Sequence, residues 1–279
     1  MCEYEPGGAV ALPGGIGISL LTVYDIEAPD GLVGGTPHVH LACSEGYYVI
    51  GGAGAVQTLT PKGFTETPLQ AGTVVWFDPG TIHRLVNDGG LQILTLMSNS
   101  GLPEAGDAGL TLPPEHLTDR ETYLEATALT GEGEARTTSA MARRDLALEG
   151  FAVLRESFET DGPSALDDFY AAAVRIVQPQ LADWRKRWEQ GARRLADETG
   201  AALDALEAVL LGDPAQLQLV AADQNRFGDD HRAVGGGQAA LLADRHDGTL
   251  EVLAQAHSAG DAVHHDADAS LVHSLASRA

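Results

Sequence analysis

The chain has 279 residues, of which 44% are hydrophobic and 20% are charged, the composition of an ordinary folded protein. Its 40 acidic and 17 basic residues give a formal net charge of −23 at pH 7. A protein that binds nucleic acid needs a basic surface to neutralise the phosphates, so this balance excludes nucleic acid as an expected partner.

Membrane insertion and secretion are also not expected. No apolar run approaches the roughly 20 residues of a transmembrane helix, and the N-terminus has no basic segment followed by an apolar one. The two cysteines, Cys2 and Cys43, fit a reducing compartment better than a disulfide. We therefore expect a soluble cytoplasmic protein.

Residues 1–115 are sparsely charged and rich in turn signals. They hold 12 acidic and 2 basic side chains. Gly51-Gly52 predicts one turn, and Asn87-Asp88-Gly89-Gly90 predicts a hairpin because asparagine and glycine tolerate positive φ angles. Short strands at such spacing indicate a β-sandwich or a barrel. The predicted strands cover residues 16–24, 36–42, 46–50, 55–60, 64–68, 73–77, 83–86 and 91–97.

The second half is rich in alanine, leucine, glutamate and arginine, which favour helices. Helices are predicted over 120–128 and 139–156. Ser164 is expected to cap a third helix over 165–177, and Pro179 suits the first position of a helix that runs to Leu211. Gly212-Asp213-Pro214 would end it.

An apolar stripe follows this last helix at a spacing close to 3.6 residues. We expect it to be buried against another helix or the barrel, or to form the interface of a homodimer. From about residue 222 large apolar residues are few, and residues 222–279 are expected to be a loose or disordered tail. The stripe consists of Leu181, Trp184, Trp188, Leu195, Leu203, Leu206 and Leu210.

Residue types that bind metals gather in the first half. Side chains alternate along a strand, so His38 and His40 project to the same side, about 6.6–6.8 Å apart. Glu45 follows a short break, and His83 opens a later strand. We predict that these four residues bind one metal ion. The alternative is that His38 or His83 is a core histidine held by hydrogen bonds.

The two segments around these residues resemble the cupin superfamily. GTPHVHLACSEGYYVIGG contains the core of its first motif, G-(x)5-H-x-H-(x)3,4-E-(x)6-G, with Leu32 at the leading glycine position. GTVVWFDPGTIHRLVN follows the second motif, G-(x)5-P-x-G-(x)2-H-(x)3-N, with Asp78 in place of the proline. The resemblance covers the N-terminal part of the chain and implies a barrel there; with the helical pattern of the second half, it predicts an α+β protein. Its cupin barrel, a double-stranded β-helix or jelly roll, covers residues 1–115, and a mainly helical region covers 116–221.

Imidazole and carboxylate ligands suit Fe(II), Mn(II), Ni(II), Zn(II) or Cu(II), and the ligand set alone does not choose among them. The resemblance favours an Fe(II)-type dioxygenase or related oxidoreductase acting on a small molecule inside the barrel. A redox-neutral isomerase, epimerase or lyase is the second hypothesis, and it needs a general base, for which Tyr47, Tyr48 and Glu66 are candidates. The third is a non-catalytic cupin that binds a small ligand.

Overall fold

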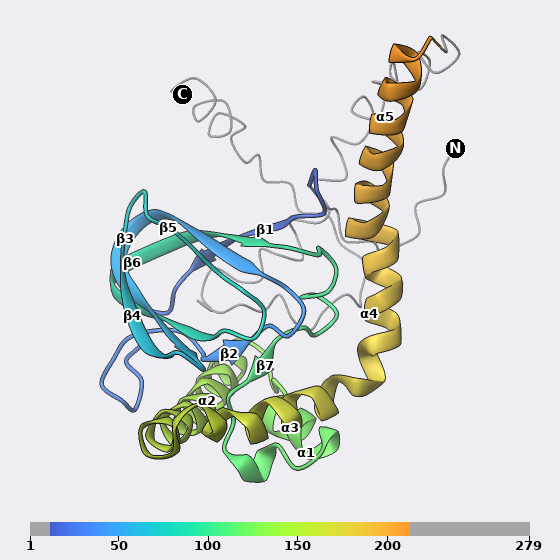
Figure 1. Cartoon of the computed structure of the whole chain (residues 1–279). Coiled ribbons are helices and arrows are strands. Elements are labelled where there is room, and N and C mark those ends of the chain that lie inside the picture. Colours follow the sequence, from blue (N-terminus) through green and yellow to red (C-terminus); the bar gives the residue numbers. More distant parts are fainter. Residues whose placement is uncertain (1–11, 213–279) are drawn as a thin grey trace.

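The computed structural model describes residues 12–212 (Figure 1). The expected tail, residues 222–279, lies outside them. The described part is an antiparallel β-barrel followed by helices, which confirms the α+β class and the barrel. None of the described helices is both long and apolar enough to cross a membrane.

The long strands β3 and β6 organise the barrel, because they pair with each other along most of their length. Near Tyr48 this pair is flanked by β5 and β1, and near Thr58 by β4 and β2, with β7 beyond β2. The two groups of strands make the two faces of the barrel (Figure 1). The strands are β1 (Gly17–Thr22), β2 (His38–Val39), β3 (Glu45–Thr60), β4 (Gly63–Gln70), β5 (Val74–Phe77), β6 (Ile82–Met97) and β7 (Gly109–Leu110).

Two predicted turns are wrong, since Gly51-Gly52 and Asn87-Asp88-Gly89-Gly90 are irregularities within β3 and β6. Bulges interrupt the pairing between Val49 and Gly54 and let both strands bend from one face of the barrel to the other. The backbone at Gly52 has φ +74°, and a Cβ there would lie 2.1 Å from the carbonyl oxygen of Gly90. Glycine at position 52 therefore allows the bend in β3 to contact the bend in β6 at Gly90.

Asn87 holds the bend in β6 instead of closing a hairpin. Its side-chain amide donates to the carbonyl oxygens of Val23 and Tyr24, 3.1 and 2.9 Å away. Its side-chain oxygen accepts from the backbone amides of Gly89 and Leu91, both at 3.0 Å. These bonds tie the segment after β1 to the bend, a long-range role that the local turn pattern does not reveal.

The helices follow the predicted order, but the helix predicted from Pro179 to Leu211 is divided into two, and the ends of the others differ. Ser164 does not cap a helix; its hydroxyl donates to the carbonyl oxygen of Asp161, within a 3₁₀ segment over Gly162–Leu166. A turn of π-helix over Glu189–Arg193 joins the last two helices. The helices are α1 (Arg120–Thr127), α2 (Glu134–Asp161), α3 (Asp167–Val177), α4 (Leu181–Trp188) and α5 (Arg194–Leu210).

The first three helices pack against one end of the barrel, close to β2 and β7 (Figure 1). A single hydrophobic core joins the barrel residues Val39, Leu59 and Ile82 to Phe151 of α2 and Phe169 of α3. The helical region therefore shares its core with the barrel. The domain boundary placed at residue 115 stays a prediction about chain organisation.

The expected burial of the stripe along residues 181–210 is wrong for most of its length. Trp184 is 4% exposed and its indole nitrogen donates to the carbonyl oxygen of Ala105, whereas Leu203 is 56% exposed and Leu210 is 86% exposed. Figure 1 shows α4 and α5 rising beside the barrel and extending past it. The spacing correctly predicts a helix, but it does not say whether the same chain covers its apolar face. The homodimer stays a prediction.

Candidate metal centre

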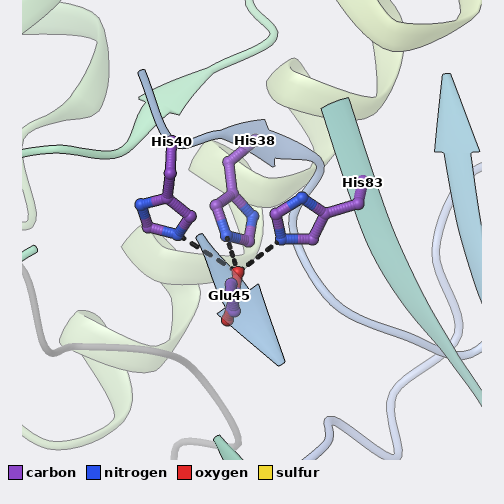
Figure 2. A group of neighbouring side chains, drawn as sticks. All are labelled: His38, His40, Glu45 and His83. Carbon is purple, nitrogen blue, oxygen red and sulfur yellow. Dashed lines mark ion pairs between the residues drawn. The ribbon is translucent and has the colours of Figure 1, made fainter. Parts of the chain in front are cut away.

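The fold brings the four predicted ligands together from three strand segments (Figure 2). His38 of β2 lies directly opposite His83 of β6 in the antiparallel register. His40 stands two residues further along from His38 and so projects to the same side, and Glu45 is the first residue of β3. One potential ligand atom from each of the four residues lies within 4.8 Å of all the others.

The carboxylate of Glu45 faces all three imidazoles. Its Oε2 atom lies 2.8 Å from Nε2 of His83, 3.3 Å from Nε2 of His40 and 4.0 Å from Nε2 of His38. The four residues are buried, with exposures of 8% or less. This arrangement presents three ring nitrogens and one carboxylate to a common point.

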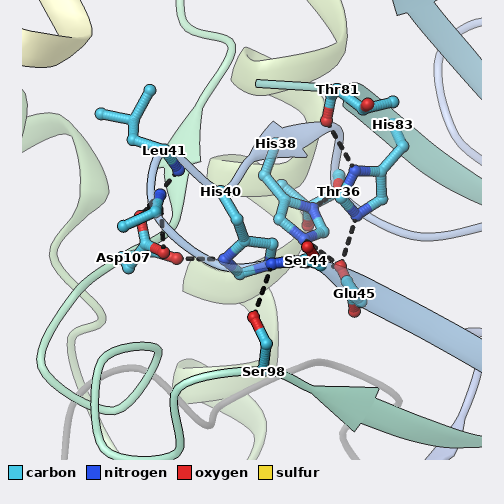
Figure 3. Close-up of polar contacts among 11 residues, drawn as sticks. Thr36, His38, His40, Leu41, Ser44, Glu45, Thr81, His83, Ser98 and Asp107 are labelled. Atoms are coloured by element: carbon cyan, nitrogen blue, oxygen red, sulfur yellow. Dashed lines mark hydrogen bonds and ion pairs between the residues drawn. The ribbon is translucent and has the colours of Figure 1, made fainter. Parts of the chain in front are cut away.

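The second nitrogen of each imidazole points away from that point and is bound by the backbone (Figure 3). A carbonyl oxygen can only accept a hydrogen bond, so each Nδ1 carries the proton and each Nε2 keeps its lone pair when the ring is neutral. Metal-binding histidines are commonly oriented in this way. Nδ1 of His38 donates to the carbonyl oxygen of Thr36 at 2.9 Å, and Nδ1 of His83 donates to that of Thr81 at 2.9 Å. Nδ1 of His40 donates to the carbonyl oxygen of Asp107.

The atoms that face the common point lack hydrogen-bond partners of good geometry. Within the described residues this holds for Nε2 of His38, His40 and His83 and for both carboxylate oxygens of Glu45. Buried polar atoms are normally hydrogen-bonded, because an unsatisfied one costs roughly 1–3 kcal/mol. A divalent cation would satisfy these atoms at once, so the residues present fit a metal ion.

The electrostatics of the cluster favour an ionised Glu45 carboxylate beside a neutral His38 imidazole. Burial and the neighbouring His83 and His40 lower the pKa of His38 to about 3. Burial alone would raise the pKa of Glu45, but the imidazoles of His83 and His40 hold it well below its usual range. For His40 the opposing effect of burial is outweighed by Glu45, and its pKa is raised. Both an ionised carboxylate and neutral imidazole are states that bind metal.

Asp107 supports the cluster and was not found by sequence reasoning. Its backbone carbonyl accepts from His40, and its buried carboxylate accepts from the backbone amides of Leu41, at 2.7 Å, and Ala42, at 3.2 Å (Figure 3). The residue lies 67 positions after His40 in an irregular segment. No local pattern marks it, because only the tertiary fold brings it to the segment after β2.

A cavity of about 500 Å³ adjoins the cluster on the side of His38. Leu21, Val23 and Leu85 of the barrel line it at this end, together with Tyr47. Phe169 and other residues of the helical region line it further out. The size is that of a small-molecule site.

The three candidate bases lie in different places. Tyr47 is 1% exposed, lines the cavity and follows Glu45 on the inner face of β3. Burial and the adjacent Glu45 carboxylate raise the pKa of Tyr47 well above its usual range. Tyr48 belongs to the opposite face of the same strand, and Glu66 is exposed on β4, where its carboxylate accepts from Gln57 at 2.8 Å. Neither of these two lines the cavity.

Cys43 is 1% exposed, and burial together with the Asp107 carboxylate raises the pKa of its thiol. Only the thiolate reacts readily with alkylating agents, so we expect Cys43 to be inert in the folded protein. At pH 8, iodoacetamide should label the peptide that contains Cys43 at least about 100-fold more slowly than after unfolding in guanidinium chloride. Mass spectrometry of the peptide measures both rates. Equal rates would show an accessible, reactive thiol.

The comparison with protein families supports the cupin superfamily. A family model described as "Cupin domain" matches residues 26–97, which end with β6. No curated protein matches the chain.

The solved structures that match the chain share little sequence with it. A conserved protein with a double-stranded β-helix domain from Klebsiella pneumoniae is 17% identical, covering 34% of this chain and 81% of that one, with a TM-score of 0.26. A predicted oxalate decarboxylase from Thermotoga maritima is 22% identical (29% and 64% covered, TM-score 0.24). A TDP-quinovose 3,4-ketoisomerase from Campylobacter jejuni is 13% identical (29% and 61%, TM-score 0.25). The match spans less than two thirds of the last two proteins.

Proposed function

Since residues 26–97 make this chain a member of the cupin superfamily, we propose that its barrel binds one divalent transition metal and acts on a small molecule in the adjoining cavity. The ligands are His38, His40, Glu45 and His83. The observation that carries the proposal is the set of five buried ligand atoms without hydrogen-bond partners within the described residues. Such a set is costly in a protein without metal and is satisfied by a cation.

We propose an Fe(II)-type dioxygenase or related oxidoreductase as the activity. A bound Fe(II) ion would supply the redox chemistry between an organic substrate and O2. Three imidazoles and one carboxylate suit this ion, although Mn(II), Ni(II), Zn(II) and Cu(II) accept the same ligands. The four ligand side chains do not fill the side of the metal site that faces the cavity, next to His38, so the substrate can approach from there.

The side chains around the cavity favour this activity over a redox-neutral isomerase, epimerase or lyase. That second class requires a general base whose pKa lies near the working pH. Apart from the ligand His38, the described lining residues that titrate are tyrosines and arginines. Burial raises the pKa of both Tyr47 and Tyr123, so both hydroxyls stay protonated at neutral pH. They are hydrogen-bond donors rather than bases.

The residues of the chain have distinct tasks in this proposal. Leu21, Val23 and Leu85 exclude water from the end of the cavity next to the ligands, which strengthens electrostatic interactions there. The protonated hydroxyl of Tyr47 is placed to donate to an oxygen of the substrate or of O2.

A parallel assay of metal-loaded protein tests the proposed activity. Metal-free protein is reloaded with Fe(II), Mn(II) or Zn(II) and mixed with a panel of small hydroxy acids, keto acids, phenols and sugars. We expect substrate-dependent O2 uptake with Fe(II) only. The products should be heavier than the substrate by the mass of the oxygen atoms added from O2. Conversion without O2 uptake, to a product of unchanged mass and with several metals, would instead establish the isomerase. Binding without any conversion would establish a non-catalytic cupin.

A further inference from the structure

Three arginines from the helical region line the cavity that adjoins the metal ligands. Arg120 is the first residue of α1, and Arg136 and Arg143 lie on α2. Arg136 and Arg143 are seven residues apart, which is close to two helical turns, so they project from the same side of α2. The cavity therefore has imidazole at its barrel end and guanidinium groups at its helical end.

The charge of this lining is opposite to that of the protein. The chain has a formal net charge of −23, yet no aspartate or glutamate is among the described residues that line the cavity. Arg120 donates to the carbonyl oxygen of Ile176 and to the side-chain oxygen of Gln180, both at 3.1 Å. Both acceptors are neutral, and among the described residues no carboxylate forms an ion pair with Arg120 within 4.0 Å.

The arginine charges affect the pKa of Tyr123, a residue that lines the cavity. The hydroxyl of Tyr123 accepts from the backbone amide of Leu110 at 3.0 Å. Burial raises the pKa of Tyr123, and the charges of Arg143 and Arg120 oppose that rise. Tyr123, Arg120 and Arg143 line the same cavity. The surrounding apolar residues Phe169 and Ile176 lower the local dielectric constant and strengthen the field.

Arg144 shows that a neighbouring arginine has a different, structural role. It is 1% exposed and donates to the backbone carbonyl oxygens of Ile26, Glu27 and Gly34, which fastens α2 to the barrel. It does not line the cavity. Arg143, the residue before it, does.

We propose that the cavity selects a small organic anion. Its carboxylate or phosphate group lies at Arg120, Arg143 and Arg136, its apolar part lies against Leu124 and Phe169, and its other end points to His38. Arginine suits both groups because its planar donors match two oxygens at once. This inference rests on the proposed function, whose substrate class it names.

Matched pairs of probes test this proposal on the full chain loaded with Zn(II). The pairs are butyrate with butyramide and butyl phosphate with butanol, and binding is measured by calorimetry. We expect at least one anion to bind about 10-fold or more tightly than its uncharged analogue, with affinity that falls as NaCl is raised. The stronger anion shows whether the group is a carboxylate or a phosphate.

Arg120→Gln should remove most of this preference and leave binding of the neutral analogues unchanged. Arg143→Gln is a second variant in case Arg120→Gln fails to fold. The control is Arg187→Gln, which removes an exposed arginine of α4 that pairs with Asp183 outside the cavity. Equal affinities for anions and neutral analogues, or anion affinity in both cavity variants within twofold of wild type, would overturn the proposal.

The zinc content of the same samples separates this inference from the proposed function. Protein with one zinc ion per chain and no preference for anions contradicts the anion site alone. Protein without zinc that still binds an anion through Arg120 contradicts the metal centre and retains the anion site.

Discussion

Replacing His38 and His40 together by alanine is expected to abolish metal binding, from one equivalent per chain in the wild type to background. The two residues supply two of the three Nε2 atoms that meet at Glu45. Loss of a residue that merely orients a metal ligand costs about 10- to 100-fold in affinity, so loss of two ligands should cost more than about 100-fold. Elemental analysis after dialysis against a weak chelator measures the effect.

Two further variants complete this experiment. His116→Ala removes a histidine outside the cluster, in the 3₁₀ turn before α1, and should keep full metal content. Glu45→Gln keeps the shape of the side chain but removes its negative charge, so it should weaken metal retention with little change in the fold. Circular dichroism checks that each variant is folded. Metal content equal to wild type in a folded double variant would rule out these ligands.

Replacing Gly150 by alanine is expected to lower the free energy of unfolding by about 3 kcal/mol, the upper part of the range for overpacked cores. Gly150 lies where α2 meets the segment after β7, and a Cβ there would be 2.1 Å from the carbonyl oxygen of Thr111 and 2.3 Å from the carbonyl carbon of Leu112. Those atoms are backbone and cannot rotate away, so α2 must move off the barrel. Urea unfolding measures the change.

Gly200→Ala is the matched control for this substitution. Gly200 lies inside α5, and a Cβ there would meet nothing within 4 Å. Alanine should therefore stabilise the helix, by up to about 1 kcal/mol. If both substitutions have the same effect, the close packing between α2 and the barrel is not a determinant of stability. If only Gly150→Ala destabilises the protein, the close approach of α2 to the segment after β7 contributes to stability.

The four residues of the metal cluster could be predicted from the sequence because their arrangement is mostly local. His38 and His40 share a side through the two-residue period of an extended chain, and the spacings to Glu45 and His83 follow a known pair of motifs. The barrel is predictable because its β-rich runs and the two motifs are local signals, although two of the turn signals lie within strands.

The remaining features depend on contacts between distant residues. Asp107 reaches His40 only in the folded chain, and Arg120 comes to the cavity only because α1 packs at the end of the barrel. The bend at Asn87 looked like a hairpin because its local residues suit one, but bonds to Val23 and Tyr24 hold it within a strand. The exposure of Leu203 was missed because periodicity defines a face and not its partner.

Anomalous diffraction from crystals of metal-replete protein tests the central claim most directly. The claim is that one transition-metal ion is bound where the three imidazoles meet Glu45. Data collected above and below the absorption edge of the metal should give one strong peak, about 2.0–2.2 Å from Nε2 of His38, His40 and His83 and from a carboxylate oxygen of Glu45. A well-ordered cluster without a peak, or a peak bound only by other residues, would contradict the claim.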